Sequence, residues 1–74
     1  MYVEGFPSRL KKARADTGFT QREVAKEIKI HYSTLANYEL GRTQPDIETL
    51  GILADFYGVS VDWLLGTKGD KKQG

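Results

Sequence analysis

Residues 20–41 read TQREVAKEIKIHYSTLANYELG, a pattern that predicts two short helices joined by a tight turn. The first helix has a sharp start because Thr20 and Glu23 occupy the two positions of a capping box, in which each side chain satisfies a free backbone donor of the other residue. The second is expected from about His31 to Glu39 or Leu40, and Gly41 ends it. Two short helices joined by so brief a turn are typical of a helix-turn-helix.

Three apolar side chains are expected to hold these two helices at a fixed angle. Ala25 stands where the helices cross, and only a small side chain lets their backbones approach. Ile30 in the turn would fill the core, and Leu35 would anchor the inner face of the second helix. The pair is therefore predicted to be rigid, with one face of the second helix left outside.

That outer face carries no charge. It comprises residues at helical spacing that are polar or small: Tyr32, Ser33, Ala36 and Asn37. An exposed helix face without a binding partner would more often carry glutamate, lysine and arginine. Short polar side chains and methyl groups can instead contact the edges of bases in the major groove of double-stranded DNA.

Three further helices are expected from their boundary residues. They are expected over Pro7 to Thr17, from the N-cap Asp46 to Gly58, and over Val61 to Leu65. Their ends are marked by proline at a first position, by a capping side chain before the first turn, or by glycine after the last turn. The sequence has no alternation of apolar and polar residues long enough to predict a strand. The sequence therefore predicts an all-α, compact five-helix domain over residues 6–66, with a flexible segment at 1–5 and a disordered polar tail at 67–74.

The composition limits the classes of function. A chain of 74 residues is one domain with a thin core, and it contains no cysteine and one histidine. No carboxylates cluster at a fixed spacing, so we expect neither an enzyme nor a metal or cofactor site, and no small-molecule ligand is evident. The first residues lack the features of a signal peptide, and no run of about 18 apolar residues is present, so we expect a cytoplasmic protein with no membrane partner.

The charge is divided unevenly along the chain. Residues 1–44 contain eight basic and five acidic side chains, and residues 45–74 contain three basic and five acidic ones. The first part can face a polyanion and the second would be repelled by one. A chance fluctuation of surface charge remains the alternative if charge is considered alone.

Residues 8–66 resemble the Cro and phage-repressor family of helix-turn-helix proteins, also called the XRE family. The likeness is carried by the spacing of several stretches: Thr20 to Ile28, Tyr38 to Gly41, Pro45 to Leu50 and Gly58 to Gly66. The resemblance implies a lambda-repressor-like fold. It also implies a sequence-specific transcriptional regulator, in particular a repressor that binds a palindromic operator in the major groove as a homodimer.

The resemblance further implies roles for single residues. In this family, DNA bases are contacted by the first exposed residues of the second helix of the pair and by a residue one turn later. These positions correspond to Tyr32, Ser33 and Asn37. Tyr32 could instead contact sugar or phosphate. Phosphate contacts fall to Gln21, Arg42 and Thr43, although Gln21 could be an ordinary residue at the start of its helix. Arg22 and His31 are also expected to contact phosphate, but His31 could merely flank the helix cap.

Other positions are expected to be structural. The resemblance implies a salt bridge between Arg14 and Glu39, and Tyr38 is expected in the core more than in a contact. Trp63 is expected to be part core and part dimer surface. Lys29 departs from the family pattern, because a glycine usually stands at this turn. The turn is therefore expected either to be strained by about 1 kcal/mol or to take another shape.

A second class of function shares the same fold. An antitoxin or a coactivator-like module would use the domain mainly to hold a protein partner, and the surface near Trp63 and the helix after Asp46 would then matter most.

Overall fold

Five helices follow one another in the computed structural model, which describes residues 5–66. They are α1 (Phe6–Thr17), α2 (Gln21–Ile28), α3 (Tyr32–Leu40), α4 (Ile47–Tyr57) and α5 (Val61–Leu65), and these described residues contain no strand. The predicted all-α, five-helix fold is thus confirmed. The predictions for residues 1–4 and 67–74 lie outside the described residues.

Side-chain caps set the starts of four helices. Thr20 and Glu23 form the predicted capping box of α2: the Glu23 N–H donates to the Thr20 hydroxyl over 3.1 Å, and the Thr20 N–H donates to the Glu23 carboxylate over 2.8 Å. Asp46 accepts from the Thr49 N–H at the start of α4. Ser60 and His31 cap α5 and α3 in the same way. Local sequence alone therefore fixes most helix boundaries.

The start of α1 is different. Gly5 takes a left-handed backbone with φ of 92° and offers no side chain to cap the helix. Its carbonyl accepts hydrogen bonds from the Arg9 N–H and the Ser8 hydroxyl. The helix begins at Phe6, one residue before Pro7, so the aromatic ring of Phe6 is already part of the first turn and is buried.

The core takes one fully buried side chain from each helix. These are Leu10, Val24, Leu35, Leu53 and Leu64. Ala25 is also buried, and Ile30 packs against the core from the turn between α2 and α3.

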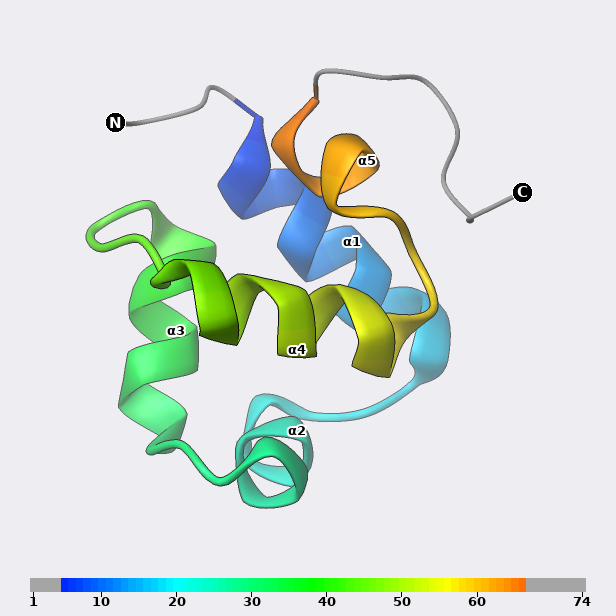
Figure 1. Ribbon diagram of the computed structural model, residues 1–74. Coiled ribbons are helices and arrows are strands. Elements are labelled where there is room, and N and C mark those ends of the chain that lie inside the picture. The colour runs from blue at the N-terminus through cyan, green and yellow to red at the C-terminus, as the bar shows by residue number, and fades with distance from the viewer. Residues whose placement is uncertain (1–4, 67–74) are drawn as a thin grey trace.

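The helices surround this core from different directions. Figure 1 shows α3 and α2 at one side and the bottom of the molecule, with α4 crossing in front and α1 and α5 behind and above. α1 packs against α3, α5 and α4, and α2 packs mainly against α3. As a result α3 is held by its inner face, and its first turn stands at the edge of the domain.

The turn between α2 and α3 has a left-handed backbone at Lys29, with φ of 65° and ψ of 46°. Among the described residues, Lys29 is the one residue other than glycine with a positive φ. Its N–H and that of Ile30 both donate to the Ala25 carbonyl. The chain thus follows the path that a glycine would take, and a residue with a Cβ carries the strain.

Candidate nucleic-acid interface

α3 has two unlike sides. Leu35 and Tyr38 are buried on the inner side, where burial also raises the pKa of the Tyr38 hydroxyl. Tyr32 and Ser33 are exposed on the outer side, and Asn37 is half-buried one turn later. Among the described residues, no hydrogen bond involves the side-chain amide of Asn37. The three residues expected to read bases therefore share one uncharged edge whose polar groups face outward.

His31 caps this helix. Its Nδ1 accepts a hydrogen bond from the Ser33 N–H over 3.1 Å and lies 2.7 Å from the Ser33 hydroxyl. Sequence reasoning left His31 open between a phosphate contact and a place beside the cap and assigned Ser33 a base contact, and it missed the bond between them. A histidine two residues before a serine at a helix start is the only signal that could have indicated it. The cap holds the first turn of α3 in place and orients the Ser33 hydroxyl.

Arg22 and Tyr32 form a second contact that sequence reasoning missed. The guanidinium carbon of Arg22 lies 3.9 Å from the centre of the Tyr32 ring, and the His31 ring stacks on Tyr32 with centroids 5.1 Å apart. A guanidinium over an aromatic face is attracted by the ring's electron density. Arg22 of α2 is thus held beside the start of α3, where its charge would face a phosphate.

Three helices meet at a buried carboxylate. The Arg14 Nε donates to Oε2 of Glu39 over 2.8 Å, and the Arg14 Nη2 donates to Oε1 over 3.0 Å. The Glu39 side chain is 3% exposed. The hydrogen bond that Arg14 donates to Glu39 raises the pKa of Arg14 above its usual value. This pair joins α1 to α3, as the family resemblance implies.

Gln21 completes the same cluster from α2. Its Nε2 donates to Oε1 of Glu39 over 3.0 Å. This bond uses one of the two amide hydrogens and leaves the amide oxygen and the second hydrogen without a hydrogen-bond partner among residues 5–66. The first residue of α2 is therefore tied to the last turn of α3, while part of its amide can still meet a ligand.

The α3–α4 loop and Trp63 complete the predicted set. Arg42 and Thr43 are exposed just after α3, and the Arg42 N–H donates to the Asn37 carbonyl, which fixes the start of the loop. Trp63 lies in the core at 7% exposure, with the Arg9 guanidinium 5.3 Å from its ring centre. The Trp63 ring offers little area to a second copy, and its role at a dimer surface stays a prediction.

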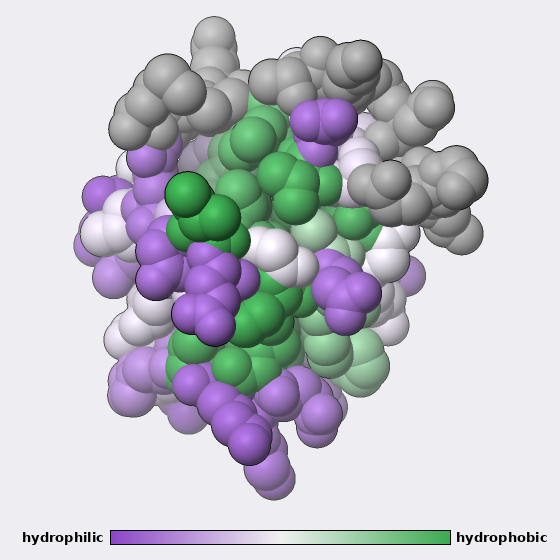
Figure 2. Space-filling model, in the orientation of Figure 1, coloured by the Kyte–Doolittle hydropathy of each residue, from purple (hydrophilic) through white to green (hydrophobic). Residues whose placement is uncertain are grey.

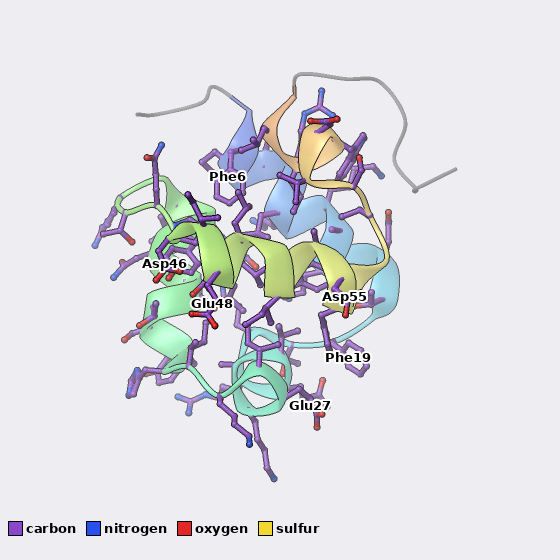
Figure 3. The ribbon with its side chains drawn as sticks, viewed as in Figure 1. Phe6, Phe19, Glu27, Asp46, Glu48 and Asp55 are labelled. Atoms are coloured by element: carbon purple, nitrogen blue, oxygen red, sulfur yellow. The ribbon has the colours of Figure 1, made fainter. Side chains whose placement is uncertain are left out.

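Acidic side chains gather elsewhere. Figure 3 shows Asp46, Glu48 and Asp55 distributed along the region of α4, and Glu27 on α2. α4 itself contains no basic residue. A polyanion would be repelled from this helix, whereas the starts of α2 and α3 and the α3–α4 loop carry Arg22 and Arg42. The charge distribution thus favours the outer edge of α3 over α4 as a surface for nucleic acid.

Beyond the outer edge of α3, the described residues form a hollow but no metal site. No group of three or more metal-ligating side chains lies together among residues 5–66. Within the same range, no helix has the length and apolar character to cross a membrane. A hollow of about 320 Å³ lies between α2 and α4, lined by Phe19, Glu23, Lys26, Glu27 and Phe56.

Comparison with known proteins gives one family. A family model described as Helix-turn-helix matches residues 10–64. Among curated relatives, the HTH-type transcriptional regulator ImmR of Bacillus subtilis (strain 168) is 47% identical over 58 residues, which cover 78% of this chain and 46% of ImmR. The cryptic phage CTXphi transcriptional repressor RstR of Vibrio cholerae is 38% identical over 56 residues, which cover 76% of this chain and 50% of RstR.

A solved structure agrees with the family model. The crystal structure of the DNA-binding domain of BldD superimposes with a TM-score of 0.74 at 29% identity and covers 86% of this chain and 93% of that one. The chain spans about half the length of the curated relatives it matches. The matched residues include α2, the turn, α3 and the loop that follows.

Proposed function

The chain belongs to the XRE-type helix-turn-helix family, and from this premise we propose that it is a sequence-specific DNA-binding transcriptional regulator. One observation carries the proposal: the outer edge of α3 is uncharged and exposed, while its inner face is anchored in the core. An α-helix with such an edge fits the major groove of duplex DNA. Tyr32, Ser33 and Asn37 would contact base edges, with adenine the natural partner of the Asn37 amide.

Phosphate contacts would set the position of α3 in the groove. Arg22, held against Tyr32, and Gln21, held against Glu39, lie at the first turn of α2. His31 precedes α3, and Arg42 and Thr43 follow it, so polar groups flank the reading edge at both ends. Such contacts fix register but carry no sequence information themselves.

We further propose that the regulator acts as a repressor and binds a roughly palindromic operator as a homodimer in the cytoplasm. Two copies related by a two-fold axis would place their α3 helices in successive major grooves, about 34 Å apart. The relatives RstR, named a repressor, and BcrR of Enterococcus faecalis, named an activator, both match this chain. We propose a repressor rather than an activator because a repressor can act by covering a promoter, and this requires no protein surface other than the one that binds DNA.

The decisive experiment is an unbiased selection of duplex DNA from a random pool, followed by footprinting of the enriched sequence. The proposal expects one enriched motif with two inverted half-sites and protection of both. Enrichment of no motif, together with no protected duplex at low salt, would overturn it. The variant Asn37→Ala would lose preference for the motif, which links the selected sequence to α3.

The hollow between α2 and α4 supports a second candidate, a module that holds a protein partner. Phe19 is 42% exposed and its ring lies 5.6 Å from that of Phe56, so two aromatic rings meet solvent there. Figure 3 places Phe19 near the Asp55 end of α4, away from the start of α3. In this case Phe19→Ser would weaken binding of the protein partner and leave DNA affinity unchanged. Asn37→Ala would weaken DNA binding and leave binding of the partner unchanged.

A further inference from the structure

A contact between the first turn of α2 and the start of α3 lies outside the core. The guanidinium carbon of Arg22 is 3.9 Å from the centre of the Tyr32 ring. Both side chains are exposed, and neither belongs to the buried cluster that closes the fold. A cation over an aromatic face is attracted only weakly where water surrounds both groups. The contact therefore orients two surface side chains and adds little to the stability of the domain.

The surroundings of this contact are polar. Figure 2 shows apolar surface gathered over α4 and α5, with hydrophilic surface along the sides formed by α3 and α2. Within residues 5–66, no carboxylate forms an ion pair with Arg22, and no hydrogen bond uses its N–H groups. The charge and the donors of Arg22 are thus available to an anionic ligand.

A guanidinium can meet a ring and a phosphate at the same time. Its flat face lies against the ring, while its N–H donors point outward in the plane of the group. Arg22 can therefore stay on Tyr32 while it donates to a phosphate beside the major groove. A lysine ammonium is a point charge without a flat face and cannot hold both partners in this way.

His31 restricts the same ring. The His31 and Tyr32 rings stack with their planes 26° apart and their centroids 5.1 Å apart. His31 is itself held in place, because its Nδ1 accepts the hydrogen bond from the Ser33 N–H. Within the described residues, no hydrogen bond uses the Tyr32 hydroxyl. The ring is therefore held by two neighbours, and its edge and hydroxyl remain for a ligand.

We infer that Arg22 determines sequence specificity by positioning Tyr32: it holds the edge and hydroxyl of the ring against one base pair of the half-site. A phosphate bound to the N–H groups of Arg22 fixes the guanidinium and, through it, the ring. The inference rests on the proposed function and deepens it. Phosphate contacts ordinarily set register without sequence information, whereas this contact takes part in reading a base.

A double-mutant cycle tests the coupling between the two residues. The variants are Arg22→Ala, Tyr32→Ala and the two combined. Their affinities are measured for the duplex enriched from the random pool and for a scrambled duplex of the same length. Arg42→Ala is the matched control, because Arg42 is an exposed arginine that contacts no aromatic ring in the part of the chain that the structure describes. Arg22→Lys keeps the charge and removes the flat guanidinium.

Arg22→Ala is expected to weaken binding to both duplexes and to reduce the preference for the enriched duplex by about threefold. In the Tyr32→Ala background, the same change should weaken both duplexes equally, because no ring remains to be positioned. Arg42→Ala should also weaken both equally. Arg22→Lys should recover affinity for the scrambled duplex but not the preference. The melting temperatures of all variants should stay close to that of the parent, which separates this role from a structural one.

A repeated selection from the random pool locates the effect. The motifs enriched by Arg22→Ala and by Tyr32→Ala should relax at the same position of each half-site, whereas Arg42→Ala should enrich the parent motif. This coincidence identifies the base pair that Tyr32 contacts.

Contrary results separate the inference from the proposed function. Equal losses on both duplexes in Arg22→Ala, or relaxation at a position that Tyr32→Ala leaves unchanged, would overturn the inference and leave Arg22 as a phosphate contact alone. A parent chain that enriches no duplex would overturn the proposed function, and the inference with it.

Discussion

Arg14 and Glu39 meet in a two-point contact that joins the first helix to the end of the third. Two nitrogens of one guanidinium donate to two oxygens of one carboxylate, at 2.8 and 3.0 Å. Such fork-to-fork geometry fixes orientation as well as distance. Because Gln21 donates to the same carboxylate, α1, α2 and α3 are all joined at this single acidic side chain.

Glu39→Ala is expected to destabilise the domain by about 3 kcal/mol, because it leaves a partly buried guanidinium without its partner. Urea unfolding followed by circular dichroism measures the change. Lys12→Ala is the control, since the Lys12–Asp16 pair is solvent-exposed at 3.7 Å and is expected to contribute less than about 0.5 kcal/mol. Equal losses in the two variants would contradict the structural role of Glu39.

Asn37→Ala is expected to reduce affinity for the selected operator by about tenfold or more, because a side chain that bonds a base edge contributes about 1–3 kcal/mol of discrimination. Binding to unrelated duplex should stay nearly unchanged. Electrophoretic mobility shift assays with both duplexes provide the comparison. Equal losses on both would show that Asn37 does not read bases.

Gln21→Ala is expected to weaken binding to every duplex by roughly tenfold, because a lost phosphate contact carries no sequence preference. The same assays at one salt concentration measure it. Since Gln21 also donates to Glu39, unfolding of the free variant must be measured separately. Glu27→Ala, exposed on α2, is the control, and a loss confined to the operator would refute the phosphate role.

Tyr57→Phe is expected to raise stability at pH 7 by about 1 kcal/mol. The Tyr57 hydroxyl is buried, and among the described residues it has no hydrogen-bond partner. Burial raises its pKa well above the ordinary value of 10.0, and the nearby Glu39 carboxylate raises it further. Because the unfolded chain loses this proton near pH 10 and the folded chain retains it to higher pH, stability is constant below about pH 10 and falls as the pH rises above it.

Urea titrations of the parent and of Tyr57→Phe at pH 7 and pH 11 test both parts of this prediction. The parent should lose more stability between the two pH values than the variant. Tyr38, whose pKa is also raised by burial, leaves a smaller alkaline loss in both proteins. A variant that is less stable at pH 7 would show that the hydroxyl has a partner.

Lys29→Gly is expected to stabilise the domain by about 0.5–1 kcal/mol, because glycine adopts a φ of 65° without the steric strain of a Cβ. Thermal and urea unfolding measure the gain. Lys26→Gly, in the interior of α2, should instead lose about 1 kcal/mol through helix propensity. A loss in both variants would show that the backbone at Lys29 is not strained.

The helix boundaries could be predicted because their causes are local. Thr20, Asp46 and Ser60 cap their own helices through a residue three positions later, and each glycine stop acts within one turn. Burial of Leu35 and Ala25 followed from the close packing that two helices joined by a tight turn require. The fold class therefore needed no knowledge of long-range contacts.

Contacts between helices were less accessible to sequence reasoning. The Arg22–Tyr32 stack joins residues ten positions apart, and no spacing rule links them. Trp63 was placed partly at the surface because of its size and late position, yet the structure buries it beneath Arg9. Ile47 shares helical spacing with Leu50 and Ala54 but is 90% exposed at the start of α4, which spacing alone does not indicate.

The buried and the exposed side chains of α3 lie on different sides of the helix, and this separation affects how the domain can change its DNA target. Leu35 and Tyr38 hold the helix in the core, while Tyr32 is exposed and Asn37 is half-buried on the outer side. Under the proposed function, substitutions on the outer edge would redirect the protein to other operators without loss of stability. Related regulators could thus acquire new targets through two or three changes, each tolerated before the next arises.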